Sequence, residues 1–172
     1  MKNIAEEIVR LCTAEIGVKE VNGTNCGERV DEYKAATWLS PKKGWPWCAA
    51  FICWIVREAL QNVGAKTKTA KFTRPRTAGA WDMENWSLQQ DSTTWTKKPH
   101  RNDILPGDIV VFLFSHIGFA VSAPDKNGYV TTVEGNTDTS GSREGGGVFR
   151  KKRHISKIRS RIRFRQDKLI PA

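Results

Sequence analysis

The chain has 172 residues, of which 39% are hydrophobic and 27% charged, and its formal net charge is +10. This length accommodates one ordinary domain with a core of its own, and the seven tryptophans and seven phenylalanines argue against a disordered chain. The four cysteines are too few for a disulfide scaffold, and without a CxxC pair or a histidine cluster a structural zinc site is not expected. We therefore expect a single domain over residues 1–172 without a structural zinc site.

The N-terminal part of the sequence has the spacing of helices. Asn3 can cap a helix whose apolar residues recur at helical intervals, and this helix should end near Gly17. Glu6 and Glu7 stand where a secretory signal would need apolar residues, so no signal peptide is expected. After a loop rich in turn-forming residues, the pattern around Val30 indicates a second, short helix.

The most apolar segment of the chain runs from Trp47 to Val56. Its ten residues are too few to cross a membrane, and they predict a buried helix that starts near Cys48. Residues 61–106 are polar and rich in loop formers, with one helix expected near residues 77–86.

In the last third of the chain the hydrophobic pattern changes to that of strands. Residues 109–114 are apolar on both faces, as the central strand of a sheet is. Two further strands are expected, at residues 116–122 and 129–136. Helices up to about residue 90, followed by an antiparallel sheet over about residues 106–168, define an α+β fold.

Almost all of the net charge lies in one segment near the C-terminus. The basic segment, from Arg150 to Arg165, holds nine basic side chains and no acidic one. From Lys157 onward, basic residues alternate with apolar or small ones, a period of two that predicts a strand with one basic face. Two interpretations stay open. The segment is either an edge strand whose charges prevent edge-to-edge pairing, or a contact surface for a polyanion such as nucleic acid, lipopolysaccharide or teichoic acid.

Cys48 is the strongest candidate for a nucleophile. Amide N–H groups at the N-terminus of a helix favour negative charge, so a thiol at this position tends toward the reactive thiolate. Cys53 lies about 140° further round the same helix and is expected to be an inert core residue. Trp47 is expected to form one wall of a substrate groove. Taken alone, Cys48 could also be a small buried hydrophobic residue, so a catalytic role requires a partner.

The predicted hairpin supplies such a partner. A turn centred on residues 125–127 places His116 opposite Asn136 with Glu134 diagonal to it, and a shifted register places His116 opposite Glu134. In both cases the three side chains share one face at one end of the hairpin. An imidazole beside a carboxylate or carboxamide is an oriented base. With a facing thiol it forms the thiolate–imidazolium pair of covalent catalysis.

Four segments of the sequence occur in the order found in a known family. They are Gly44-Trp45-Pro46-Trp47-Cys48-Ala49-Ala50-Phe51, Pro106-Gly107-Asp108-Ile109-Val110-Val111-Phe112, His116-Ile117-Gly118-Phe119-Ala120-Val121 and Val133-Glu134-Gly135-Asn136-Thr137. Over nearly its whole length the chain resembles the CHAP amidohydrolases/peptidases, papain-like cysteine hydrolases of the NlpC type that cut peptidoglycan. The resemblance implies that Cys48 is the nucleophile, His116 the general base and Glu134 the residue that orients it. Asn136 would line the substrate site together with Trp47, and it is the competing candidate for orienting His116.

The resemblance implies a peptidoglycan amidase or endopeptidase that works through a thioacyl-enzyme and needs no cofactor. With no signal peptide in view, the chain looks like a single-domain phage endolysin, made in the host cytoplasm and acting on the cell wall as a monomer. Peptidoglycan is the expected partner, anionic envelope polymers are a second candidate through Arg150 to Arg165, and nucleic acid is not expected. The alternatives are a secreted antibacterial wall-degrading toxin, an acyltransferase of the same fold, a noncatalytic wall-binding protein and a basic nucleic-acid-binding protein.

Overall fold

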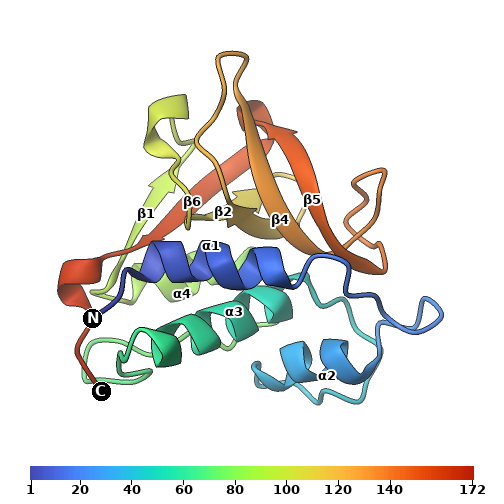
Figure 1. The fold of residues 1–172 in the computed structure, drawn as a ribbon, viewed down its shortest axis with the longest axis horizontal. Helices are drawn as coiled ribbons and strands as arrows, with labels where there is room; N and C mark the ends of the chain where they lie inside the picture. Colours follow the sequence, from blue (N-terminus) through green and yellow to red (C-terminus); the bar gives the residue numbers. More distant parts are fainter.

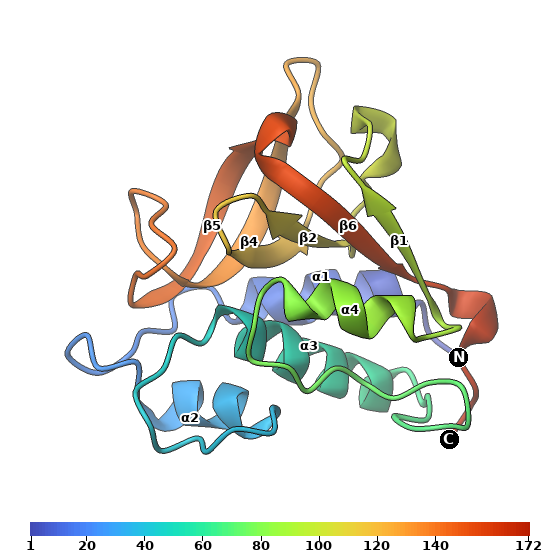
Figure 2. The ribbon, with the colours of Figure 1, turned by 180° about the vertical axis from the view of Figure 1, so that it is seen from behind.

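A layer of helices lies against a six-stranded antiparallel sheet in the computed structural model, which describes residues 1–172 (Figure 1). The helices are α1 (Ile4–Ala14), α2 (Glu28–Ala35), α3 (Cys48–Asn62) and α4 (Asp82–Leu88). The strands are β1 (Thr93–Lys97), β2 (Ile109–Phe112), β3 (Ile117–Ala120), β4 (Tyr129–Thr137), β5 (Gly147–His154) and β6 (Ile158–Phe164), in the spatial order β1-β6-β2-β3-β4-β5. Helices α1, α3 and α4 pack on the sheet, and α2 packs against α3 (Figures 1 and 2). The predicted α+β fold is confirmed.

Helix α3 begins at Cys48, as predicted, and lies at the centre of the molecule. Eleven of its fifteen residues are buried, because α1, α2 and the sheet surround it. Helix α1 begins after Asn3, whose side-chain oxygen accepts hydrogen bonds from the backbone N–H groups of Ala5 (2.9 Å) and Glu6 (3.2 Å). The predicted helices α1 and α3 are thus confirmed, although α1 ends at Ala14 rather than near Gly17.

Two features of residues 61–106 differ from the expectation. Helix α4 begins at Asp82 instead of near residue 77, because the Thr77 hydroxyl accepts a hydrogen bond from the N–H of Gly79 (3.2 Å) in a local turn that competes with a helix. Strand β1 (Thr93–Lys97) was not expected, because its residues are mostly polar and hydrophobic alternation does not mark it. Threonine and tryptophan nevertheless favour strands when a partner strand is present.

The hairpin of β3 and β4 has the first of the two predicted registers, with Phe119 paired to Val133. The Asp125 side chain closes its turn, since one carboxylate oxygen accepts a hydrogen bond from the N–H of Tyr129 (3.0 Å). Strands β2 and β3 are shorter than predicted. The tight turn between them includes Ser115, which has a φ of 55°.

Strand β6 holds the C-terminal half of the basic segment, and it lies inside the sheet between β1 and β2. The edge-strand interpretation is therefore wrong for β6, because β1 covers its edge along five paired residues. Strand β5, which carries Arg150 to Arg153, does lie at an edge of the sheet. The predicted period of two is confirmed, since the alternate residues are buried: Ile158, Ser160, Ile162 and Phe164. Arg159 forms an ion pair with the buried Glu84 (3.0 Å). Arg163 does the same with the buried Asp108 (2.7 Å).

The two ends of the chain lie side by side, at the end of the molecule opposite the start of α3 (Figures 1 and 2). The Gln166 side chain accepts a hydrogen bond from the N–H of Ile4 (2.9 Å), and the N–H of Ala172 donates to the carbonyl of Gly64 (2.8 Å). None of the helices has the length and apolar character needed to span a membrane.

Candidate active site

Cys48 is the first residue of α3, and its side chain is 7% exposed. The start of α3 lies beneath the end of β4 and the start of β5, where the loops at residues 18–27 and 138–146 project from the molecule (Figure 1). Gly135 permits this close approach, because a Cβ atom there would lie 2.8 Å from the Trp47 ring and 2.9 Å from Phe51 Cβ. Because Gly135 has no side chain, the start of α3, with Cys48, can pack directly against β4.

His116, directly before β3, lies beside Glu134 of the neighbouring strand β4, and both side chains are completely buried. Nε2 of His116 is 3.0 Å from Oε2 of Glu134. Gly118 makes room for this contact, since a Cβ atom there would lie 2.6 Å from Cγ of Glu134. The structure therefore brings the imidazole and the carboxylate together, and the Cys48 thiol interacts with the same imidazole.

His116 and Glu134 each stabilise the charged form of the other. Burial alone lowers the pKa of His116, but the Cys48 thiol and the Glu134 carboxylate outweigh it and raise this pKa to about 9. Burial raises the pKa of Glu134, but hydrogen bonds and charges from Arg153 and His116 lower it to about 2. At neutral pH the pair is therefore an imidazolium beside a carboxylate.

Arg153 also belongs to this site, although the sequence placed it in a basic segment apart from the chemistry. It reaches Glu134 from β5, with its Nε 2.9 Å from Oε1 and its Nη2 2.5 Å from Oε2. The register of β4 and β5 explains the contact, because Val130 pairs with Arg153 and Val130 lies on the same face of β4 as Glu134. Pairing of β4 with β5 was not among the predictions. With that pairing, the sequence alone places Arg153 on the same face of the sheet as Glu134.

Asn136 makes its contacts elsewhere. Its side-chain oxygen accepts a hydrogen bond from the N–H of Trp47 (2.5 Å), and its side-chain nitrogen donates to the carbonyl of Gly145 (2.8 Å). Asn136 thus ties the residue before Cys48 to the sheet, and the carboxylate of Glu134, not the amide of Asn136, meets the His116 ring.

Trp47 does not form a wall of an open groove, so this prediction is wrong. Its side chain is completely buried. The indole packs on Tyr33 at a ring-centroid distance of 5.6 Å, and its N–H donates a hydrogen bond to the Glu20 carboxylate (3.0 Å). Because the ring has an aromatic neighbour in the core and a hydrogen-bond acceptor in the partly exposed Glu20, it packs inward from the helix start.

The other cysteines lie in different surroundings. Cys12 and Cys53 are buried, and burial raises the pKa of each thiol to about 12. Cys26 is partly exposed, with its sulfur 3.5 Å from Nζ of the buried Lys34. No three side chains of His, Cys, Asp or Glu come together in an arrangement that could hold a metal ion.

A polar hollow of about 510 Å³ opens beside the start of α3. It is lined by Lys19, Glu20, Gly23, Asn25, Pro46, Glu144 and Gly146, none of which is hydrophobic. Pro46 is two residues from Cys48, and Oδ1 of Asn25 lies 3.4 Å from the Asn136 amide nitrogen, so the hollow adjoins the candidate site. Such a lining suits a polar, charged substrate.

Comparison with known protein families gives one match. The family model described as the CHAP domain matches residues 40–136, which is more than half of the chain. The matched range contains Cys48, His116, Glu134 and Asn136, and it ends before Arg153. No curated protein and no solved structure matches the chain.

Proposed function

The chain belongs to the CHAP family of cysteine, histidine-dependent amidohydrolases/peptidases, and we propose that Cys48, His116 and Glu134 catalyse its cleavage of peptidoglycan. Helices packed on an antiparallel sheet agree with the papain-like fold of this family. One observation carries the assignment of the residues: the thiol that begins a buried helix faces a buried imidazole–carboxylate pair.

The geometry supports a two-step reaction through a thioester. The Cys48 thiolate attacks the carbonyl carbon of an amide, and backbone N–H groups at the start of α3 stabilise the oxyanion that forms. His116 gives its proton to the leaving amine, and the C–N bond breaks. His116 then accepts a proton from water as the water attacks the thioester. The C–S bond breaks, the product leaves as a carboxylic acid that ionises in solution, and the thiolate–imidazolium pair is restored. Glu134 holds the ring and stabilises its cation throughout.

A finer proposal concerns the biological role. We propose that the protein is a bacteriophage endolysin that degrades the wall of its host. The wall-degrading chemistry of the family and the strongly basic charge of the chain support this role, because bacterial envelopes are anionic. A secreted antibacterial toxin has the same chemistry. An endolysin should lyse cells when expressed inside them together with a protein that opens the membrane, whereas a toxin should act on neighbouring cells.

Digestion of purified sacculi tests the hydrolase function. Mass spectrometry of the soluble products should show fragments with new amino groups and new carboxylates, because an amide bond is replaced by its two hydrolysis products. The positions of these groups distinguish cleavage at N-acetylmuramoyl–L-alanine from cleavage of a peptide bond. New reducing sugar ends would contradict the proposal. With an added small amine, incorporation of that amine in place of water would identify an acyltransferase.

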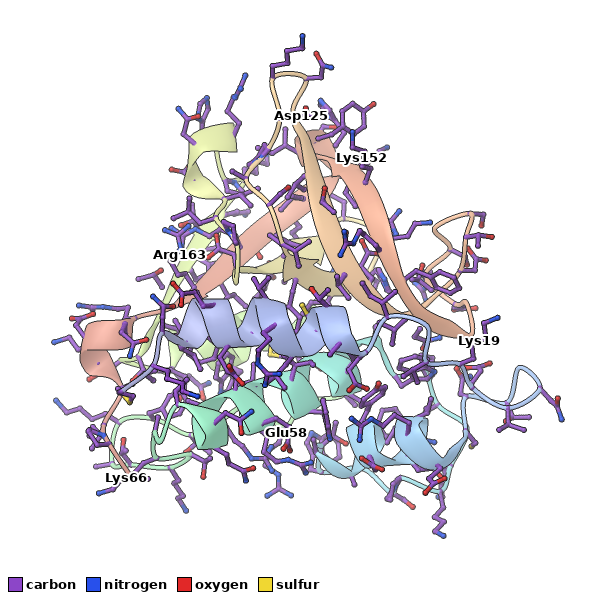
Figure 3. All side chains as sticks on the ribbon, viewed as in Figure 1. Lys19, Glu58, Lys66, Asp125, Lys152 and Arg163 are labelled. Carbon is purple, nitrogen blue, oxygen red and sulfur yellow. The ribbon has the colours of Figure 1, made fainter.

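The exposed part of the basic segment carries a separate proposal, namely that it collects the enzyme on anionic envelope polymers. Arg159 and Arg163 are ion-paired within the fold, so they are poor candidates for this contact. Four other basic residues are exposed: Arg150, Lys152, Lys157 and Arg165. Figure 3 shows Lys152 at the end of the sheet far from the helices, where it lies 3.7 Å from Asp125.

Glutamine at these four positions should weaken binding to sacculi and leave turnover of a small soluble muropeptide nearly unchanged. The loss should resemble the effect of added salt, because ions screen exposed charges beyond about 8–10 Å at 0.10–0.15 M. A matched control neutralises four exposed lysines elsewhere: Lys66, Lys68, Lys71 and Lys168. Binding is measured by co-sedimentation at low salt. Equal binding by the two quadruple variants would show that only the net charge matters, and would contradict a specific role of the basic segment.

A further inference from the structure

The Glu134 carboxylate is enclosed by protein, and three side chains contact it. Arg153 approaches both carboxylate oxygens, at 2.9 and 2.5 Å. The Thr132 hydroxyl donates a hydrogen bond to Oε1 (2.5 Å), and His116 lies 3.0 Å from Oε2. Glu134 is therefore held by a bidentate guanidinium, and one of its two oxygens, Oε2, also faces the imidazole.

The Arg153 guanidinium itself is shielded from water. The side chain is 13% exposed, and its Nη2 also donates to the carbonyl of Gly141 (3.2 Å). The guanidinium carbon lies 5.4 and 5.1 Å from the ring centroids of Phe112 and Phe114. The same two rings stack beside the His116 imidazole, at 6.0 and 5.9 Å. In such surroundings the attraction between opposite charges is stronger than at an exposed surface.

A completely buried carboxylate needs a permanent positive partner to stay ionised. His116 is not permanent, because it must give up its proton in each cycle. The charged groups that face Glu134 are Arg153 from β5 and His116, which stands before β3, and those that face His116 are Cys48 from α3 and Glu134. Among the interactions that lower the pKa of Glu134, the hydrogen bond from Arg153 is the largest. Without Arg153, the proton of the imidazolium would pass more readily to Glu134 and leave a neutral pair.

We propose that Arg153 is a positioning residue of the catalytic site, which keeps Glu134 ionised and turned toward His116 so that the Cys48 thiolate retains its imidazolium partner. The proposal rests on the proposed roles of these three residues. It goes beyond the family match, because Arg153 lies outside residues 40–136. It also gives one residue of the basic segment a role in the chemistry rather than in envelope binding.

The pH dependence of Cys48 alkylation by iodoacetamide tests this proposal without any peptidoglycan. The rate at the Cys48 peptide, followed by mass spectrometry, reports the thiolate fraction, and Cys26 serves as an internal reference. In Arg153→Met the carboxylate loses its charge partner, so the imidazolium is less stable and the thiolate forms at higher pH. The midpoint of the rate profile should move upward by about one pH unit or more. Arg153→Lys keeps the charge but not the bidentate contact, and its midpoint should lie in between.

Arg163 provides the matched control. It also holds a buried carboxylate through two contacts, both at 2.7 Å to Asp108, but it touches none of the site residues. Arg163→Met should reduce stability as Arg153→Met does, yet leave the Cys48 midpoint unchanged. If both variants lower the melting temperature and neither moves the midpoint, Arg153 is an ordinary structural ion pair and the proposal is overturned.

In Arg153→Met the buried Glu134 carboxylate has lost its partner, which can unfold the protein. A double variant avoids this problem. Glu134→Gln removes this charge, so adding Arg153→Met to Glu134→Gln should move the Cys48 midpoint no further. A second full shift in the double variant would show that Arg153 acts by another route, and would also overturn the proposal. Failure of the wild-type protein to cleave sacculi, with the alkylation results as expected, would instead refute the proposed substrate alone.

Discussion

Replacement of Cys48 by alanine should abolish the release of amines from sacculi, with a loss of at least about 10⁴-fold, because no other group in the site can form the thioester. Cys48 alone combines a helix N-terminus with an adjacent histidine. The assay is a time course of free amino groups, with the melting temperature of each variant measured in parallel. Because the alanine side chain is only slightly smaller than that of cysteine, the variant should keep its fold and bind sacculi as the parent does.

The remaining cysteines provide the controls for this result. Cys12→Ala, Cys26→Ala and Cys53→Ala should each retain activity when folded. Cys12 and Cys53 are shielded in the core, where burial holds their thiols protonated at neutral pH by raising the pKa to about 12. Full activity in Cys48→Ala, or complete loss in Cys26→Ala alone, would show that the nucleophile has been wrongly assigned.

Replacement of His116 by alanine should cost about as much as loss of the nucleophile, because the residues of such a site act as a unit. The imidazole both stabilises the thiolate and donates the proton to the leaving amine. Glu134→Gln should cost less, about 10²-fold, because an amide can still hold the ring but cannot stabilise its cation. The values of kcat/KM on a soluble muropeptide give this order directly.

Asn136→Ala provides the comparison for the orienting residue. Asn136 ties the N–H of Trp47 and the carbonyl of Gly145 together, so its loss should reduce stability and loosen the start of α3. Its effect on kcat/KM should be smaller than that of Glu134→Ala. A far larger effect at Asn136 would transfer the orienting role from Glu134 to Asn136.

The parts of the fold that could be predicted are those with a strong local pattern. The apolar run from Trp47 to Val56 predicts α3 and its start at Cys48. The strand period and the turn at residues 125–127 allow two registers, both of which place His116 near Glu134, and the structure has the first. These inferences need only neighbours within one element or one hairpin. They account for the thiol, the imidazole and the carboxylate of the site.

The parts that could not be predicted depend on partners far apart in the chain. The acidic partners of Arg159 and Arg163 lie 75 and 55 residues away, so the basic segment looks like a free charged face in the sequence. Strand β1 owes its existence to pairing with β6, which no local period reveals. For Trp47, the sequence places an aromatic residue at the helix start, but it does not give the direction in which the ring points.

The position of the two chain ends has a practical consequence. Both ends lie at the opposite end of the molecule from the start of α3, held by the contacts of Ile4 with Gln166 and of Ala172 with Gly64. A partner protein or a solid support attached at either end would therefore face away from Cys48 and from the polar hollow beside it. The enzyme should tolerate fusion or immobilisation through its ends while the polar hollow stays open to a substrate as large as an intact cell wall.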